Sequence, residues 1–341
     1  MPDTEKILVV GPAWVGDMVM AQALFMLLRE QNPDVVIDVL APAWSEPLLA
    51  RMPEVRNTVL MPIGHGQFHL GKRFQIGREA RSAGYDQAIV LPRSMKSALI
   101  PFFAGIPHRV GYRGEMRYGL LNDIRDLNRN ALDQTVKRFV SLGLPPNMSL
   151  TEIPEPRLSV DKANRDSLVQ RLGLTKEGPV VALIPGAAYG PAKCWPLEYF
   201  VRLTSDLVAA GASVWILGSE SERDVGESIK QQSGDQAINL CGATRLEDTV
   251  DLLSRAQAAV TNDSGLMHVA AAAGTHVVAL YGSTSPSFTP PLTRRKTIFY
   301  LQLDCSPCFQ RECPLEHLRC LRDIDPAVVL ADVNAVIDQT H

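Results

Sequence analysis

The chain has 341 residues, a net charge of −3, and hydrophobic and charged fractions of 46% and 21%. This length exceeds one typical domain core, and the composition is that of a soluble globular protein. The negative balance excludes a protein coated in positive charge, so we expect no nucleic-acid partner. The start MPDTEKILVVG lacks the features of a secretory signal, and no run reaches the roughly 20 apolar residues of a membrane span. We therefore expect a cytoplasmic protein.

The first half alternates short apolar runs with helical periodicity. Residues 6–10 form a β-branched run, and residues 16–31 place apolar side chains on one helical stripe. Further short apolar runs, each followed by turn residues, occupy residues 35–40, 55–61 and 87–91. This alternation predicts a mostly parallel sheet with helices on both faces.

The second half repeats the pattern after a stretch with four prolines, residues 145–156, which is typical of a linker. We expect a helix over residues 161–172. The alternating strands and helices that follow are predicted at residues 180–184, 197–210, 213–217, 256–261, 266–273 and 276–281.

A last helix is predicted over residues 326–340, with Asp325 as N-cap and Pro326 at its first position. The sequence as a whole predicts an α/β fold of two domains, residues 1–157 and 158–325, facing a cleft at the carboxyl ends of both sheets.

The first glycine-bearing loop, Gly11 to Asp17, lies between a predicted strand and a predicted helix. It does not match the dinucleotide-binding motif G-x-G-x-x-G, which argues against a dehydrogenase. Asp17 falls in the first turn of the helix, where the macrodipole favours an ionised carboxylate. Such a group suits a general base towards a sugar hydroxyl, and the alternative is that Asp17 only caps its helix.

A second loop, residues 184–196, also leads from a strand into a helix and contains Gly186 and Lys193. Its backbone amides and the lysine suit a phosphate, although the loop does not match the P-loop motif. The alternative is an ordinary solvated lysine.

The third candidate is the turn Thr261-Asn-Asp-Ser-Gly-Leu-Met-His268. Ser264 and Gly265 would present amides to a diphosphate at the start of a helix. Asp263 would either bind the ligand or serve only as the N-cap. His268 lies one turn after Ser264 on the same face, so it would point into the cleft or be structural.

Charged residues mark two further candidates. Glu220 follows a predicted strand and suits ribose hydroxyls. Residues 93–117 contain five basic side chains against the single acid Glu115 and suit an anionic acceptor, the alternative being a solvated face. The five are Arg93, Lys96, Arg109, Arg113 and Arg117.

Four cysteines, Cys305, Cys308, Cys313 and Cys320, are spaced C-x2-C-x4-C-x6-C. Only the first pair has a spacing common in zinc sites. A loop of reduced thiols is favoured over a metal or redox site.

Four blocks together resemble the ADP-heptose:lipopolysaccharide heptosyltransferases, over about residues 6–281. They are VVGPAWVGDMVMAQALF, FFAGIPHRVGYRGEMRYGLLND, PGAAYGPAKCWP and VTNDSGLMHVAAAAGTHVVALYGSTSP. The second block is more similar to the heptosyltransferase II branch than to the heptosyltransferase I branch.

The resemblance implies a GT-B fold of two Rossmann-like domains, with acceptor bound by the first, donor by the second, and the helix at residues 326–341 packing back on the first. It implies inverting transfer of L-glycero-D-manno-heptose from ADP-heptose to the first heptose of heptosyl-Kdo2-lipid A, at the cytoplasmic face of the inner membrane. ADP-heptose is a substrate, and no cofactor is required.

Residue by residue, the resemblance makes Asp17 the base and Lys193 the diphosphate ligand. The other implied donor contacts are Gly186, Glu220, Asp263, Ser264, Gly265 and His268. The expected acceptor contacts are Gly16 and, from the charge pattern, the five basic residues of segment 93–117. Two alternatives remain: a sugar-nucleotide epimerase or hydrolase on the same scaffold, and a non-catalytic nucleotide-sugar-binding protein.

Overall fold

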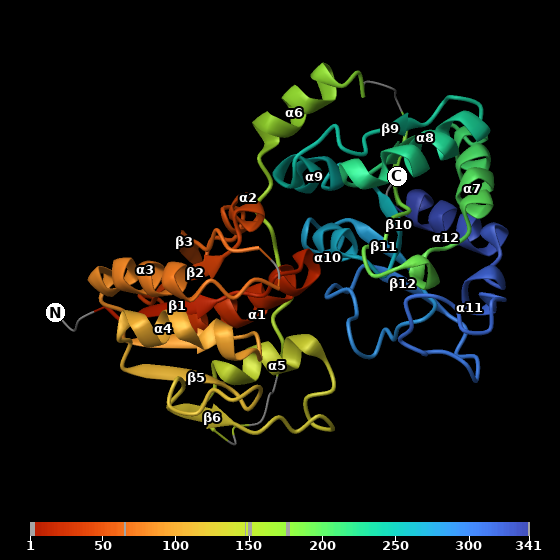
Figure 1. The fold of residues 1–341 in the computed structure, drawn as a ribbon. Coiled ribbons are helices and arrows are strands. Elements are labelled where there is room, and N and C mark those ends of the chain that lie inside the picture. Colours follow the sequence, from red (N-terminus) through yellow and green to blue (C-terminus); the bar gives the residue numbers. More distant parts are fainter. Residues whose placement is uncertain (1–3, 65, 147, 149–151, 175–177, 340–341) are drawn as a thin grey trace. The chain divides into compact units, whose positions relative to one another are not determined.

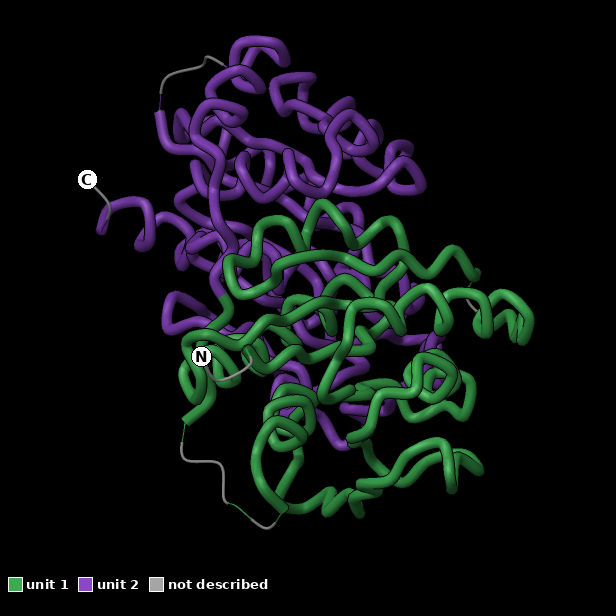
Figure 2. The backbone as a smooth tube through the Cα atoms, turned by 90° about the vertical axis from the view of Figure 1, so that its left-hand side faces the viewer, with its two compact units in different colours: residues 1–156 green, residues 157–341 purple. Residues whose placement is uncertain are grey.

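The computed structural model describes residues 4–64, 66–146, 148, 152–174 and 178–339. The chain divides into two compact units, residues 1–156 and 157–341 (Figure 2). The division falls one residue before the boundary expected from the sequence. The expected linker, residues 145–156, ends at this division, although residues 147 and 149–151 of it lie outside the described part.

Unit 1 contains a six-stranded parallel sheet with the order β3-β2-β1-β4-β5-β6 (Figure 1). Its strands are β1 (Lys6–Val10), β2 (Val36–Ala41), β3 (Val55–Leu60), β4 (Gln87–Val90), β5 (His108–Tyr112) and β6 (Asp123–Arg125). Its α-helices are α1 (Val15–Gln31), α2 (Glu46–Leu49), α3 (Leu70–Ala80), α4 (Leu99–Ala104) and α5 (Thr135–Leu142). The chain starts at the centre, moves to one edge and returns to fill the other, which is a doubly wound topology.

Unit 2 repeats this topology, with the sheet order β12-β11-β10-β7-β8-β9 and all pairs parallel. Its strands are β7 (Val180–Ile184), β8 (Ser213–Ile216), β9 (Ile238–Asn239), β10 (Ala258–Asn262), β11 (His276–Tyr281) and β12 (Lys296–Tyr300). Its α-helices are α6 (Lys162–Arg171), α7 (Leu197–Ala209), α8 (Arg223–Gln232), α9 (Leu246–Leu253), α10 (Gly265–Ala272), α11 (Arg319–Arg322) and α12 (Pro326–Asp338).

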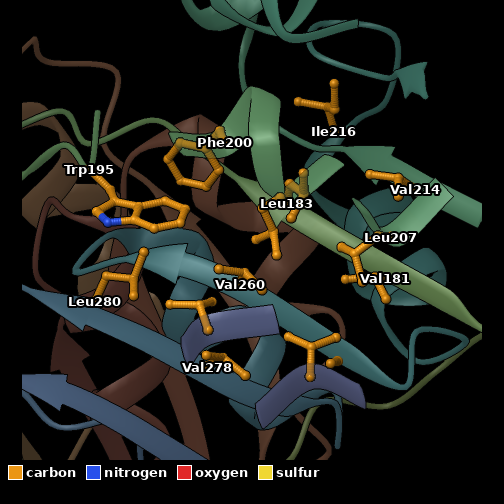
Figure 3. Close-up of a cluster of buried hydrophobic side chains, with 14 of the residues drawn as sticks. Val181, Leu183, Trp195, Phe200, Leu207, Val214, Ile216, Val260, Val278 and Leu280 are labelled. Atoms are coloured by element: carbon orange, nitrogen blue, oxygen red, sulfur yellow. The ribbon is translucent and has the colours of Figure 1, made fainter. Parts of the chain in front are cut away.

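The core of unit 2 forms between its sheet and helices α7 and α12 (Figure 3). Trp195 is fully buried there, and its indole N–H donates to the carbonyl of Ile324 at 3.1 Å. Its backbone N–H donates to the side-chain oxygen of Asn262 at 2.9 Å. Trp195 therefore fixes the loop after β7 against both the end of β10 and the segment before α12.

Helix α12 begins as expected: the Asp325 carboxylate accepts from the N–H of Ala327 at 2.9 Å, which confirms the N-cap. The helix buries Val329 and Val333 in the core of unit 2, on α7, β10 and β11. Its apolar stripe thus completes the core of unit 2, and that the segment also packs back on the first domain stays a prediction. Among the described helices, none has both the length and the apolar content needed to cross a membrane.

Candidate active site

The predicted site loops lie at the switch points of the two sheets. In unit 1 the strand order reverses between β1 and β4, and the loop of residues 11–14 follows β1 directly. In unit 2 it reverses between β7 and β10, which the loops at residues 185–195 and 263–264 follow. Open α/β sheets bind ligands at this point, outside the carboxyl ends of the strands.

Asp17 is a half-buried carboxylate in the first turn of α1. The N-cap position of this helix belongs to Trp14, so Asp17 lies three residues inside the helix rather than at its cap. Gly11 and Gly16 are buried beside it, and a Cβ added to Gly11 would come within 2.7 Å of Met18 Cε. The Met18 side chain therefore packs directly against this glycine, and a larger residue would require that side chain to shift.

Lys193 is not an ordinary solvated lysine. Its Nζ lies 2.6 Å from Asp263 Oδ2 and 3.3 Å from the Asp263 carbonyl, and its side chain is 15% exposed. The hydroxyl of Thr284 donates to the same Asp263 oxygen at 2.6 Å. These contacts bring together residues from the turns after β7, β10 and β11. Thr284 is a member of the site that sequence reasoning missed.

Asp263 is not the N-cap of α10. That position is held by Ser264, whose hydroxyl accepts from the N–H of Met267 at 3.4 Å. Gly265 is the first residue of the helix. Within the predicted donor turn, Ser264 is therefore the N-cap of α10, and Asp263 pairs with Lys193.

His268 is buried rather than exposed to a ligand. Burial lowers its pKa to about 4, with Asp263 raising it and Lys193 lowering it again. At neutral pH the imidazole is therefore uncharged. It contributes shape and a hydrogen-bonding group beside the Lys193–Asp263 pair, and no positive charge.

Glu220, the predicted ribose ligand, is an exposed side chain that pairs with Arg223 at 2.8 Å. Glu222 lies closer to the loop after β7, because a Cβ added to Gly186 would collide with its carboxylate. Glu222 Oε2 also accepts from the N–H of Ser219 at 2.6 Å. Gly186 thus makes room for an acidic side chain that sequence reasoning missed.

The five basic residues of segment 93–117 separate into two groups. Arg117 is 1% exposed; its guanidinium donates to the carbonyl of Pro92 at 2.7 Å and to that of Tyr112, and burial lowers its pKa to about 10. Arg109 donates to the carbonyls of Leu120, at 2.7 Å, and Ile106. Both guanidinium groups are thus hydrogen-bonded within unit 1, and their role as acceptor contacts stays a prediction.

The other three basic residues retain surface. Arg93 and Arg113 are exposed, and Lys96 is partly exposed. Arg93 donates to the Arg113 carbonyl at 3.3 Å, and Arg113 pairs with Asp126 at 3.1 Å. These three side chains keep surface through which they can meet an anion.

The four cysteines of the C-terminal segment line one small cavity of about 20 Å³, together with Ser283 and His317. All four are free thiols. Within the described ranges, no three His, Cys, Asp or Glu side chains are grouped so as to hold a metal ion. The cluster predicted from the spacing therefore exists in space, as thiols around a shared cavity.

Two Rossmann-like doubly wound units, with the predicted site loops at their switch points, are the architecture of GT-B type glycosyltransferases. The comparisons with known proteins agree. The model of glycosyltransferase family 9 (heptosyltransferase) matches residues 73–319. The chain is 43% identical to lipopolysaccharide heptosyltransferase 2 of Escherichia coli K12, over 98% of this chain and 99% of that one.

It is also 45% identical to lipooligosaccharide heptosyltransferase 2 of Haemophilus influenzae, over 87% and 88% of the two chains. The solved structure of the E. coli ADP-heptose LPS heptosyltransferase II superposes with a TM-score of 0.88, at 41% identity, over 98% and 99% of the chains. The chain belongs to glycosyltransferase family 9. Its relatives are transferases, so the epimerase, hydrolase and non-catalytic alternatives are not favoured.

Proposed function

We propose that this glycosyltransferase moves L-glycero-D-manno-heptose from ADP-heptose to the first heptose of heptosyl-Kdo2-lipid A, with inversion. The observation that carries the proposal is the identity of 43% over nearly the whole of both chains, with a relative named heptosyltransferase 2. Both switch-point sites lie inside this matched length. An ADP-heptose donor agrees with the similar solved structure, which is that of an ADP-heptose LPS heptosyltransferase II.

In the proposed reaction, Asp17 takes the proton of the acceptor hydroxyl, whose oxygen attacks the anomeric carbon. The bond from that carbon to the diphosphate oxygen breaks, and ADP leaves on the opposite face. One base is sufficient for this single displacement. The position of Asp17 in the first turn of α1 supports the role, because the helix dipole favours its ionised form.

The leaving diphosphate gains negative charge, which Lys193 and the first amides of α10 would stabilise. Lys193 is held beside that helix by Asp263, so its ammonium is already positioned when the donor binds. Removing one such electrostatic partner typically costs about 10²–10³ in rate. Gly186, Glu222 and Glu220 would line the nucleoside side of the donor. Gly16, Arg93, Lys96 and Arg113 would face the acceptor.

The test is ADP release and product mass with ADP-heptose and heptosyl-Kdo2-lipid A, for the wild type and Asp17→Asn. A product one heptose heavier, lost in Asp17→Asn while ADP binding is unchanged, is expected. Asp34→Asn, at an exposed position of unit 1, is the matched control and should retain activity. Equal ADP release without any acceptor would contradict the proposal and indicate a hydrolase.

We also propose that the enzyme docks at the cytoplasmic face of the inner membrane through helices α3 and α4, which pack side by side in unit 1 (Figure 1). Large apolar side chains are exposed on and beside these helices, namely Phe68, Leu70, Phe74 and Phe102. Exposed basic residues accompany them, namely Lys72, Arg78 and Arg81. Aromatic side chains with a basic rim suit an anionic lipid surface.

Vesicle sedimentation tests this surface. Vesicles rich in phosphatidylglycerol should bind the protein more strongly than phosphatidylcholine vesicles. Phe74→Ser with Phe102→Ser should weaken binding by roughly tenfold. The control is Trp44→Ser with Leu60→Ser, which removes exposed apolar surface elsewhere on unit 1. Equal vesicle binding by the two double variants would contradict the proposal that this surface docks on the membrane.

A further inference from the structure

The segment around Phe309 and Arg311 is fastened to the loop that carries Lys193. The Tyr189 hydroxyl donates to the carbonyl of Phe309 at 2.6 Å, and the N–H of Ala192 donates to that of Arg311 at 3.0 Å. Gly190, at φ +154°, lies between these contacts, and a Cβ there would come within 2.6 Å of the Arg311 carbonyl. The backbone of Arg311 is therefore fixed relative to the Lys193 loop.

Lys193 and Arg311 share one aromatic partner. Lys193 Nζ lies 5.2 Å from the ring centre of Tyr189, and Arg311 Cζ lies 5.5 Å from the same ring centre. Both distances are within the range of cation–π attraction. Tyr189 thus holds two cations from chain segments more than a hundred residues apart in sequence.

The charges of the two cations are balanced differently. Lys193 is paired with Asp263, which is itself buried, so the local charge of that pair is close to zero. In the part of the chain that the structure describes, the guanidinium of Arg311 has no hydrogen bond or ion pair, and the side chain is exposed. A diphosphate that carries at least two negative charges needs positive charge beyond the Lys193–Asp263 pair.

We propose that Arg311 binds the diphosphate of the nucleotide-sugar donor, as a second cation beside Lys193 on Tyr189. The inference rests on the proposed function, because it requires a nucleoside diphosphate sugar as the donor. The planar guanidinium suits two phosphate oxygens at once, which a lysine ammonium does not. Tyr189 positions the side chain, and the Arg311 carbonyl, which a substitution of the side chain leaves in place, anchors its backbone.

Titration calorimetry with ADP and with adenosine tests the inference on the full chain. Arg311→Gln is expected to weaken ADP binding by roughly tenfold to a hundredfold and to leave adenosine binding unchanged. The ADP affinity of Arg311→Lys should lie between those of the wild type and Arg311→Gln. The matched control is Arg319→Gln in the same segment, since Arg319 is exposed but already paired with Asp323 at 3.0 Å. That variant should bind both ligands as the wild type does.

Thermal unfolding of each variant shows whether the fold is intact. Equal ADP affinity of the wild type and Arg311→Gln would overturn the inference while leaving the donor proposal in place. Equal losses for ADP and adenosine would also overturn it, because they would show a general disturbance of the site. UDP and GDP are measured alongside. If the wild type binds none of the three diphosphates, the proposed donor fails and the inference fails with it.

Discussion

Lys193 Nζ and Asp263 Oδ2 lie 2.6 Å apart, with side chains only 15% and 6% exposed. The two residues are 70 positions apart in the chain. Their pairing joins the loop after β7 to the turn after β10, on the two sides of the switch point of unit 2. The ammonium proposed to meet the donor is thus held by a carboxylate that is itself fixed by Thr284.

Replacing only one partner of this pair should destabilise unit 2. Lys193→Met leaves a buried carboxylate without its cation, which typically costs about 3 kcal/mol of unfolding free energy. The double variant Lys193→Met, Asp263→Asn removes both charges and should recover part of that loss. Chemical denaturation measures both. The tryptophans of unit 1 are first replaced by Phe (Trp14 and Trp44), so that fluorescence reports unit 2.

The control is Lys230→Met, which removes a surface lysine of α8 whose pairing with Glu227 at 3.8 Å is exposed. It should change stability by no more than about 0.5 kcal/mol. Asp263→Asn alone is measured as well. If the loss of unfolding free energy in the double variant equals the sum of the losses in the two single variants, the pair is not coupled.

Burial of His268 predicts a pH dependence of stability. Its pKa falls from 6.5 to about 4 on folding, so the unfolded chain binds the proton more tightly. The free energy of unfolding therefore has its full value, as far as His268 is concerned, above pH 6.5. It decreases as the pH falls towards 4, by up to about 3 kcal/mol. Denaturation of unit 2 at a series of pH values measures the effect.

His268→Gln provides the comparison, because its amide does not titrate in this window. The difference in stability between wild type and variant should shrink or reverse towards pH 4. Parallel curves for the two proteins would mean that His268 does not change its pKa on folding.

The central strands and site loops could be predicted because their sequence signals are local. β1, β7 and β11 are short, apolar and buried runs, and their predicted bounds match the structure. The edge strands β6 and β9 were missed, because β6 has three residues and β9 has two, all only partly buried. Helix α3 also escaped prediction, since much of its surface is exposed and polar.

The sequence could predict which loops carry the site residues, but it could not predict which residues contact one another. No spacing shows that Lys193 meets Asp263, since only the sheet order brings their loops together. The burial of Arg117 could not be predicted from the sequence either. It depends on the carbonyls of Pro92 and Tyr112 converging, whereas a cluster of arginines in a sequence is as typical of a ligand surface.

Gly114 offers a test of the acceptor side. A Cβ there would collide with the carbonyl of Arg93, so Gly114→Ala should displace the loop that carries Arg93. We expect a higher KM for the lipid acceptor, with the Kd for ADP unchanged. Asp34→Asn, at an exposed position of unit 1, is the control. If both variants have the wild-type acceptor KM, the Arg93 loop does not contribute to acceptor binding.

The thiols should differ in their rate of alkylation. Burial, reinforced by the other three cysteines of the cavity, raises the pKa of Cys320 to about 11, and burial raises that of Cys241 to about 12. The thiolate is the reactive form, so at pH 8 only about one in a thousand Cys320 thiols can react at a given moment. Cys305, Cys308 and Cys313 are half-buried and should be labelled first.

Iodoacetamide labelling followed by peptide mass analysis measures these rates, and labelling of Cys320 should rise about tenfold for each pH unit. The control is a denatured sample, in which all six cysteines should react at similar rates. If the four cavity thiols are instead protected together, and a chelator releases them together, the cavity holds a thiolate-bound metal ion. That pattern would contradict free thiols, because coordination removes all four from reaction whatever their individual exposure.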